Sequence, residues 1–375
     1  MKKAILIATV QSHICQFHRP LIEILKKNGY EVHVAARDNL DEKNGLKLEN
    51  VDRIFDIEFH RSPFNFSNIR AYKQLRSILK REQYEIISCN TPVGGIVSRL
   101  AARDMSAKVY YMAHGFHFYK GAPKKNWILY YPIEKLFSSL TDCLITITKE
   151  DYNFAKQSKF KTKICYLPGV GVDQNRFMNV NKEEIENLEN QYGCYNKTVL
   201  LCTGELNKNK NQKNLIEAMQ NVVKYHDNVI LFLAGNGPLE KELKMMVENL
   251  NLDKYVVFLG YRTDIEKFVQ LSDIVISVSN REGLPLNIIE AMICSKAIIV
   301  SNNRGHRELI TNNVNGILLD KNESNILSNK IIELLDNKKL RELYGKNAFD
   351  DSKKYWVDNI KNMLKEIYLG GKSEQ

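Results

Sequence analysis

Two glutamates, Glu282 and Glu290, lie on either side of the bend Gly-Leu-Pro-Leu at residues 283–286. The run DIVISVS before this bend has the apolar, β-branched composition of a buried strand, and the segment after it favours a helix. The two carboxylates therefore bracket a strand-to-helix turn. Pro285 suits the first turn of the helix, and backbone amides at a helix start favour an anion such as phosphate.

The charge of the two glutamates restricts what such a turn can bind. Glu282 is itself an anion, so the ligand must also offer hydroxyl donors or a positive centre, and a sugar phosphate offers both. Glu290 lies in the apolar segment IIEAM, where a carboxylate is costly unless it is hydrogen-bonded, and the vicinal diol of a ribose would satisfy it. The alternative is structural: Glu282 is favoured by the helix dipole and Glu290 is an exposed helix residue. The occurrence of both in one turn favours the functional interpretation.

The composition indicates a globular protein with two domains. The chain has 375 residues, of which 44% are hydrophobic and 26% are charged. No apolar stretch approaches the ~18 residues that span a bilayer, and the start MKKAILIATVQSH reads as a first strand, which predicts a cytoplasmic protein.

The positive charge is concentrated in the first half. Residues 1–180 contain 28 Lys and Arg against 17 Asp and Glu, whereas the remainder contains 26 against 27. This asymmetry predicts that the N-terminal half meets an anionic surface, which could be nucleic acid, phospholipid or a diphosphate substrate; a solvated basic face is the alternative.

The cysteines and histidines show no metal-binding spacing. Seven scattered cysteines form no CxxC pair and read as small buried hydrophobes, and the eight histidines form no HExxH motif. We expect no metal and no cofactor.

The order of strands and helices predicts an α/β fold with two Rossmann-like domains facing across a cleft. Apolar strand runs alternate with helical segments from residue 4 to about residue 168, and a second alternation begins at TVLLCTG. We place an N-terminal domain at 1–172 and a C-terminal domain at 173–351, with a closing helix in 352–375 that packs back on the first. Ligands of such sheets bind beyond the carboxyl ends of the strands.

Several motifs resemble glycosyltransferase family 4, retaining enzymes of the GT-B fold. They include EGLPLNIIEAM, with its Glu-x7-Glu spacing, KAIIVSNNRGHRELITNNVNGILLD, TGELNKNKNQKNLIEAM and FLAGNGP. The resemblance covers nearly the whole chain. The stretch AHGFHFYKGAPKKNWILYYPIEK is similar to bacterial capsule and O-antigen enzymes that extend lipid-linked sugars.

The resemblance implies a UDP-sugar donor, transfer of an N-acetylated hexosamine and a polyprenyl-diphosphate saccharide acceptor bound by the N-terminal domain. It implies that Glu290 holds the ribose, that Glu282 and His114 face the transferred sugar, and that Lys210 contacts the diphosphate. The main chain of Tyr261 and Arg262 would border the base. The other implied donor-binding positions are Gly204, Glu205, Lys208, Gly283, Leu284, Pro285 and Leu286.

Two departures from the family pattern affect the diphosphate site. Many members have Arg where this chain has Glu205. Either Lys208 supplies the missing charge, or Glu205 turns away to pair with a lysine. The glycine-rich loop common after the first strand is replaced by QSHICQFHRP, in which Ser12 and His13 are the candidate substitutes.

The chemistry expected from the resemblance is transfer with retention and without a metal. The chain lacks an Asp-x-Asp pair, so Lys210 and helix-start amides would stabilise the leaving diphosphate. In front-face attack the leaving phosphate oxygen accepts the acceptor's proton, and Glu282 then acts as a positioning and electrostatic group.

The stretch FHFYKGAPKKNWILYY mixes lysines with aromatic residues, a composition that suits a phospholipid headgroup layer. The basic N-terminal domain would then bind the inner face of the plasma membrane. The alternative is a buried aromatic helix face with a solvated lysine rim.

Competing functions are a UDP-sugar epimerase of related fold and a nucleic-acid-binding protein, although no RNA-binding motif is evident and no nucleic acid is expected. A dinucleotide oxidoreductase is disfavoured because the first turn lacks G-x-G-x-x-G.

Overall fold

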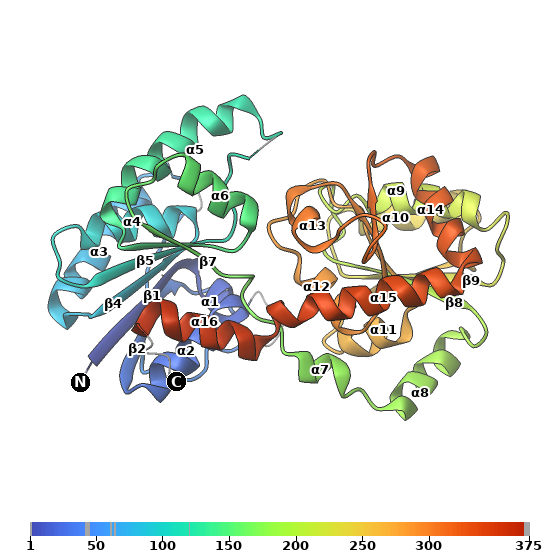
Figure 1. Cartoon of the computed structure of the whole chain (residues 1–375), viewed down its shortest axis with the longest axis horizontal. Coiled ribbons are helices and arrows are strands. Elements are labelled where there is room, and N and C mark those ends of the chain that lie inside the picture. The colour runs from blue at the N-terminus through green and yellow to red at the C-terminus, as the bar shows by residue number, and fades with distance from the viewer. Residues whose placement is uncertain (1, 42–45, 61, 64, 120, 371–375) are drawn as a thin grey trace. The chain divides into compact units, whose positions relative to one another are not determined.

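The chain folds into two compact α/β units. The structure, a computed structural model, describes residues 2–41, 46–60, 62–63, 65–119 and 121–370. The first unit comprises Met1–Gly171 with Val357–Gln375, and the second comprises Val172–Trp356. Each contains one parallel sheet covered by helices (Figure 1). The predicted fold class, two parallel-sheet α/β domains, is confirmed.

The chain returns from the second unit to the first at Val357. This is five residues later than 352, where the sequence suggested that the closing helix begins. Residues 353–356 stay with the second unit because Tyr355 is fully buried in its core and the Tyr355 hydroxyl donates to the carbonyl of Glu308 at 3.2 Å. Val172 pairs with Trp356 at the same place.

The first unit has a seven-stranded sheet in the order β3-β2-β1-β4-β5-β6-β7. Its strands are β1 Lys2–Val10, β2 Tyr30–Arg37, β3 Arg53–Asp56, β4 Ile86–Asn90, β5 Lys108–Ala113, β6 Cys143–Thr146 and β7 Lys163–Tyr166. Its helices are α1 Gln11–Phe17, α2 Arg19–Lys27, α3 Ser67–Glu82, α4 Pro92–Ala102, α5 Lys124–Phe137, α6 Lys149–Gln157 and α16 Val357–Leu369, with a 3₁₀ turn at Ser138–Leu140.

Both faces of this sheet are covered, which explains why its strands are apolar runs without alternation. Helices α3, α4 and α5 lie on one face, and α2 and α16 lie on the other (Figure 1). The last helix is anchored by Tyr368, which is 3% exposed. The Tyr368 ring stacks on Tyr110 at 4.3 Å, and its hydroxyl lies 2.9 Å from Oγ of Ser88.

The second unit has a six-stranded sheet in the order β10-β9-β8-β11-β12-β13. Its strands are β8 Thr198–Thr203, β9 Val229–Ala234, β10 Val256–Gly260, β11 Ile274–Ser277, β12 Ala297–Ser301 and β13 Ile317–Leu319. Its helices are α7 Gln174–Met178, α8 Lys182–Tyr192, α9 Gln212–Val222, α10 Glu240–Asn249, α11 Ile265–Leu271, α12 Leu286–Ile293, α13 Arg304–Leu309, α14 Ser324–Asp336 and α15 Lys338–Ser352, with a 3₁₀ turn at Lys353–Tyr355.

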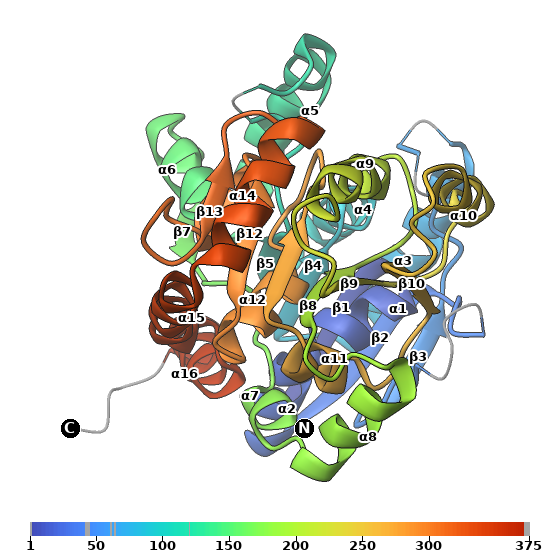
Figure 2. The ribbon, with the colours of Figure 1, turned by 90° about the vertical axis from the view of Figure 1, so that its right-hand side faces the viewer.

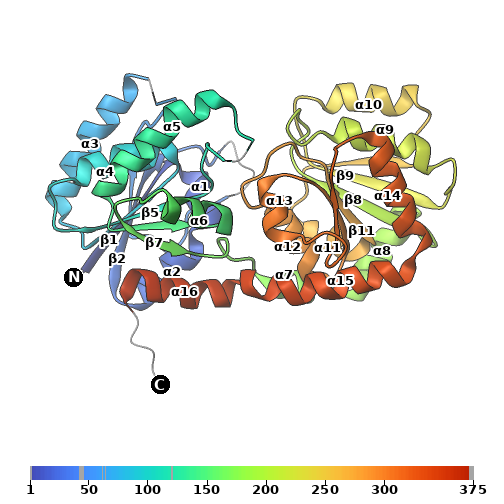
Figure 3. The ribbon, with the colours of Figure 1, turned by 45° about the horizontal axis from the view of Figure 1, so that its top comes forward.

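Two apolar cores, one on each face, hold this sheet. Helices α9, α10 and α14 cover one face, and α11, α12 and α15 cover the other (Figures 2 and 3). Ile274 and Ile276 point into the first core and Val275 into the second, as expected for a strand buried on both sides.

Each sheet has one point at which the strand order reverses. In the first unit it lies between β1 and β4, and in the second it lies between β8 and β11. Ligands of open α/β sheets bind beyond the carboxyl ends of the strands at such points. These two places are therefore where chemistry is expected, and each is described below within its own unit.

Candidate active site

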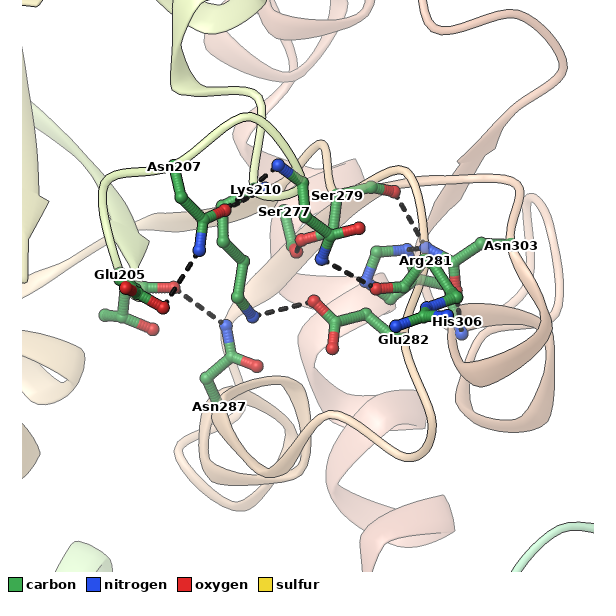
Figure 4. A network of polar contacts seen from close by, with 12 residues as sticks. Glu205, Asn207, Lys210, Ser277, Ser279, Arg281, Glu282, Asn287, Asn303 and His306 are labelled. Atoms are coloured by element: carbon green, nitrogen blue, oxygen red, sulfur yellow. Dashed lines mark hydrogen bonds and ion pairs between the residues drawn. The ribbon is translucent and has the colours of Figure 1, made fainter. Parts of the chain in front are cut away.

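The reversal point of the second unit carries an ion pair between Lys210 and Glu282. Lys210 lies in the loop between β8 and α9, and Glu282 lies in the loop between β11 and α12. The Nζ atom of Lys210 is 2.7 Å from Oε1 of Glu282, and the two side chains are 21% and 14% exposed. Figure 4 shows the pair at the centre of a network of polar side chains. The pairing is consistent with the prediction that both residues belong to one site.

Side-chain hydrogen bonds shape the loop that carries Lys210. Oδ1 of Asn207 accepts from the backbone amides of Asn209 (3.0 Å) and Lys210 (2.9 Å). Gly204 begins the loop at φ 139°, and a Cβ there would lie 3.0 Å from the Lys210 side chain. Only glycine suits this position, because an L side chain would be strained and would displace the lysine.

The same loop is bound to the loop of Glu282. The amide of Asn280 donates to the carbonyl of Asn209 at 2.7 Å, and Nδ2 of Asn209 donates to the carbonyl of Arg281 at 3.0 Å. Nδ2 of Asn280 donates to the carbonyl of Lys208 at 3.0 Å. These bonds fix the separation of Lys210 and Glu282 although the two residues are 72 positions apart in the sequence.

His306, on the short helix α13, lies beside Glu282 (Figure 4). Its side chain is fully buried, and burial lowers its pKa to about 4. With a proton on Nδ1 the ring donates to the carbonyl of Ser301 at 2.7 Å, which leaves Nε2 as an acceptor without a partner among the described residues. His306 was not predicted as a site residue, although it lies in the stretch KAIIVSNNRGHRELI. The signal was its place just beyond a buried strand.

Gly305 allows this close approach. A Cβ at this position would lie 2.6 Å from the carbonyl oxygen of Gly283 and 2.9 Å from Cβ of Glu282. The start of α13 therefore fits against the bend that follows Glu282 only without a side chain at residue 305.

Glu290 lies on α12, and burial raises its pKa to about 7. Arg176 opposes this rise electrostatically, but that guanidinium is paired with Glu266 at 2.7 Å. Within the described part of the chain, no hydrogen-bond donor to the Glu290 carboxylate is found. The group is thus poised to accept hydrogen bonds from a ligand.

The remaining residues expected at the bend start α12. Pro285 is the residue before the helix, Leu286 is its first residue, and Gly283 and Leu284 precede them. No side chain caps this helix start. Nδ2 of Asn287 donates to the carbonyl of Thr203 at 3.3 Å, which ties α12 to the end of β8.

Glu205 does not pair with a lysine. Its carboxylate accepts from Nδ2 of Asn207 at 2.9 Å, and no ion pair to it occurs among the described residues. The expectation that Glu205 pairs with a lysine is therefore corrected: the side-chain amide of Asn207, two residues along the same loop, takes the place of the lysine. Lys208 is exposed, and so is Glu205.

Tyr261 and Arg262 follow β10, at the same edge of the sheet as the ion pair. Tyr261 is 53% exposed. The Arg262 guanidinium is occupied by Asp264, with two contacts of 2.8 and 2.7 Å, and lies 4.9 Å from the ring of Phe268. The side chain of Arg262 is thus structural, which leaves its main chain as the group available to a ligand.

In the first unit, Ser12 and His13 lie on α1, and His114 directly follows β5. The amide of Ser12 donates to Oδ1 of Asn39 (3.1 Å), and its hydroxyl accepts from Nδ2 of Asn39 (2.9 Å). The backbone amide and the hydroxyl of Ser12 are therefore both hydrogen-bonded within the first unit. The rings of His13 and His114 lie 4.5 Å apart, and burial lowers the pKa of both imidazoles.

The aromatic residues of the first unit are mainly core residues. Phe116 and Phe118 are 4% and 1% exposed and stack on each other at 4.7 Å, and Trp127 packs against Phe154. The expectation that these aromatic rings meet lipid is thus not supported, because they fill the space between α5 and the sheet. Lys124 and Lys125 are exposed, whereas Lys120 lies outside the described residues. Across the described ranges, no helix is both long enough and apolar enough to cross a bilayer.

Two parallel-sheet α/β units with polar side chains at the carboxyl ends of their strands have the architecture of the GT-B fold. The description "Glycosyl transferases group 1" matches residues 184–351, and "Glycosyl transferase 4-like" matches residues 3–148. The chain is 38% identical to the putative glycosyltransferase EpsD of Bacillus subtilis (strain 168), over 98% of this chain and 96% of the relative. It belongs to the glycosyltransferases of family 4, and the predicted family is confirmed.

Two further similarities agree with this assignment. The chain is 29% identical to the UDP-Gal:alpha-D-GlcNAc-diphosphoundecaprenol alpha-1,3-galactosyltransferase of Escherichia coli, over 81% of this chain and 82% of that protein. The fold is similar to that of HepE from Anabaena, solved in complex with UDP and glucose, with a TM-score of 0.76, 22% identity and coverage of 99% of this chain and all of the other.

Proposed function

We propose that this glycosyltransferase moves a sugar, an N-acetylated hexosamine or a related hexose, from a UDP-sugar to a saccharide linked to polyprenyl diphosphate. The observation that carries the proposal is the Lys210–Glu282 pair at the reversal point of the second unit, on the same helix-and-bend segment as Glu290. A cation, a helix start and two carboxylates together match the phosphates and hydroxyls of a sugar nucleotide.

Each residue has a separate task in this proposal. Glu290 accepts hydrogen bonds from the ribose hydroxyls, and Lys210 neutralises the charge that develops on the leaving diphosphate. Glu282 faces the transferred sugar, while the main chain of Tyr261 and Arg262 borders the base.

The ion pair must rearrange when the donor binds. In the free protein the Lys210 ammonium is paired with the Glu282 carboxylate. A diphosphate offers the lysine two negative charges instead of one. Binding then releases the Glu282 carboxylate toward the sugar hydroxyls. The transfer proceeds with retention, and an oxygen of the leaving phosphate accepts the proton of the attacking hydroxyl, so that no enzymic base is required.

The relatives support the lipid-linked acceptor. The Escherichia coli relative is named for a galactose donor linked to UDP and an acceptor linked to diphosphoundecaprenol. The net charge of the first 180 residues is the second support, since a diphosphate lipid and its membrane are both anionic.

An exposed apolar face on α5 supports a peripheral position on the membrane. Ile128 and Leu136 are 77% and 69% exposed and lie two helical turns apart, with the exposed Pro132 between them. Lys124, Lys125 and Lys135 are exposed on the same helix. We therefore propose that α5 inserts these aliphatic side chains among anionic headgroups on the cytoplasmic side.

The decisive experiment presents the purified chain with UDP-sugars and a polyprenyl-diphosphate sugar. UDP release that requires the lipid acceptor, and an α-linked product from an α-linked donor, are expected. Incubation of each UDP-sugar without acceptor tests the epimerase alternative: formation of an epimer there, with no transfer when acceptor is added, would overturn the proposal.

A further inference from the structure

Three histidines meet in the first unit, and the proposed transfer reaction does not use them together. His13 lies on α1, His18 lies between α1 and α2, and His114 follows β5. One ring nitrogen from each lies within 4.8 Å of the corresponding atoms of the other two. Among the described residues, no carboxylate or thiol belongs to this group.

Several of these ring nitrogens are buried without a partner. They are Nε2 of His13, both nitrogens of His18 and Nε2 of His114, none of which has a hydrogen-bond partner in the described part of the chain. His18 is only 1% exposed. A buried polar group without a partner destabilises the fold, so a ligand that satisfies several at once would stabilise it.

The chemistry of the cluster favours a cation over an anion. A neutral imidazole can donate only one N–H to an anion, and the stronger alternative, three adjacent imidazolium rings, would be self-repulsive in a buried place. Neutral imidazoles instead offer lone pairs. Three nitrogen donors suit zinc, copper or nickel ions, whereas magnesium and calcium prefer oxygen ligands.

The ring positions are close to those that a metal requires. The ring centroids are 4.5 Å apart for His13 and His114, 5.4 Å for His13 and His18, and 5.3 Å for His18 and His114. Zinc–nitrogen bonds of about 2.0–2.1 Å in a tetrahedral site place neighbouring nitrogens roughly 3.4 Å apart. Side-chain movements of about 1 Å would therefore complete the site.

The backbone around the cluster is well fixed. The amide of His18 donates to the carbonyl of Ile14 at 3.0 Å, and the carbonyl of His18 accepts from the amide of Ile22 at 3.1 Å. The ring of Phe17 packs against both His13 (4.8 Å) and His114 (5.5 Å). The three imidazoles are thus held together by the fold before any ligand binds.

We propose that His13, His18 and His114 bind one divalent transition-metal ion, with zinc as the best fit. Three protein ligands leave one coordination position for an exchangeable ligand. His13 also lines a cavity of about 310 Å³ beside the ends of β1 and β4, together with Thr9, Thr91 and Tyr130. Water or an oxygen atom of a bound molecule can reach the fourth position from this cavity.

The test measures metal binding by the full chain without any sugar nucleotide. Chelator-treated protein is titrated with Zn²⁺ by calorimetry, and with Co²⁺ by visible absorption. One ion per chain is expected, with a dissociation constant in the micromolar range or below and tetrahedral Co²⁺ bands. His18→Ala should lose this binding, whereas His226→Ala, a histidine of the second unit paired with Asp336, should retain it.

Absence of binding by the wild-type chain would overturn the proposal, as would unchanged stoichiometry in folded His18→Ala. A thiolate-to-cobalt charge-transfer band would also contradict it, because it would place the ion on a cysteine. If circular dichroism shows that His18→Ala is unfolded, His13→Gln serves instead, since His13 is less buried. No outcome depends on glycosyl transfer, so failure of this site and failure of the proposed function are separate results.

Discussion

The ammonium of Lys210 lies 2.7 Å from Oε1 of Glu282, across a loop-to-loop contact that joins the ends of β8 and β11. Both side chains are only partly buried, so the pair contributes little to stability, on the order of 1 kcal/mol or less. Its importance is chemical, because the lysine is held where a diphosphate would compete for it.

Lys210→Gln should lower kcat roughly 100-fold or more, since removal of a preorganised cation from a developing negative charge costs several kcal/mol in the transition state. The melting temperature should change little. Steady-state measurement of UDP release checks this, with Lys213→Gln as the control because Lys213 is exposed at the start of α9. Equal kcat for both variants would remove Lys210 from the reaction.

Glu290→Gln should weaken binding of a UDP-sugar about tenfold or more, because charge-assisted hydrogen bonds to the ribose are lost. Since the pKa of Glu290 is raised to about 7 by burial, wild-type affinity should also increase between pH 6 and pH 8 as the carboxylate forms. The variant should show no such increase. Calorimetry at both pH values, with the exposed Glu248→Gln as control, decides the matter.

The same carboxylate predicts how the ligand-free chain responds to pH. The pKa of Glu290 is about 7 in the folded chain and 4.5 ordinarily, so the folded state favours the protonated carboxyl. The stability that comes from this protonated group is fully present below pH 4.5 and is lost as pH rises through 7. The free energy of unfolding should fall over this window by about 3 kcal/mol more in the wild type than in Glu290→Gln. Denaturant titrations of both proteins test this; parallel pH profiles would contradict it.

Gly305→Ala should reduce activity while the chain remains folded. The new Cβ would lie 2.6 Å from the carbonyl oxygen of Gly283, so the bend that holds Glu282 must move. The control is Gly345→Ala. Gly345 lies on α15, where a new Cβ would meet the backbone of Ser295, away from the ion pair. Both variants should lose stability, but only Gly305→Ala should lower kcat at a temperature where both are folded.

Ile128→Glu with Leu136→Glu should weaken binding to vesicles that contain anionic lipid. Both side chains are exposed on α5, and carboxylates there would be repelled by the headgroups. Met245→Glu, on the exposed face of α10 in the second unit, is the matched control. Co-sedimentation of the double variant at the wild-type level would exclude α5 as the membrane-binding helix.

Local patterns were sufficient to predict the strands and the fold class. KVYYMA became β5, and DIVISVS contains β11, because continuous apolar runs of this length are stable only between two helical layers. The nearness of Lys210 and Glu282 was also predictable in outline, since both follow strands of one parallel sheet and must meet at one edge.

The details that depend on how loops turn were not predictable. His306 reaches Glu282 only because Gly305 permits close backbone contact. His13, His18 and His114 converge from two separate segments, and their spacing along the chain carries no metal-binding signature. For the aromatic residues near α5 the sequence left two alternatives, lipid contact or a buried helix face, because composition does not reveal which face of the segment the sheet covers: Phe118 is buried, whereas Ile128 is exposed.

The return of α16 to the first unit has a consequence for biosynthesis. The second unit is one uninterrupted segment, whereas the first needs residues from both ends of the chain. During translation, Val172–Trp356 can therefore complete its fold before the first unit does, because Tyr368 reaches Ser88 and Tyr110 only after α16 has left the ribosome. A stop codon ahead of Val357 would remove α16 and leave α2 without its neighbour on that face of the earlier-made sheet.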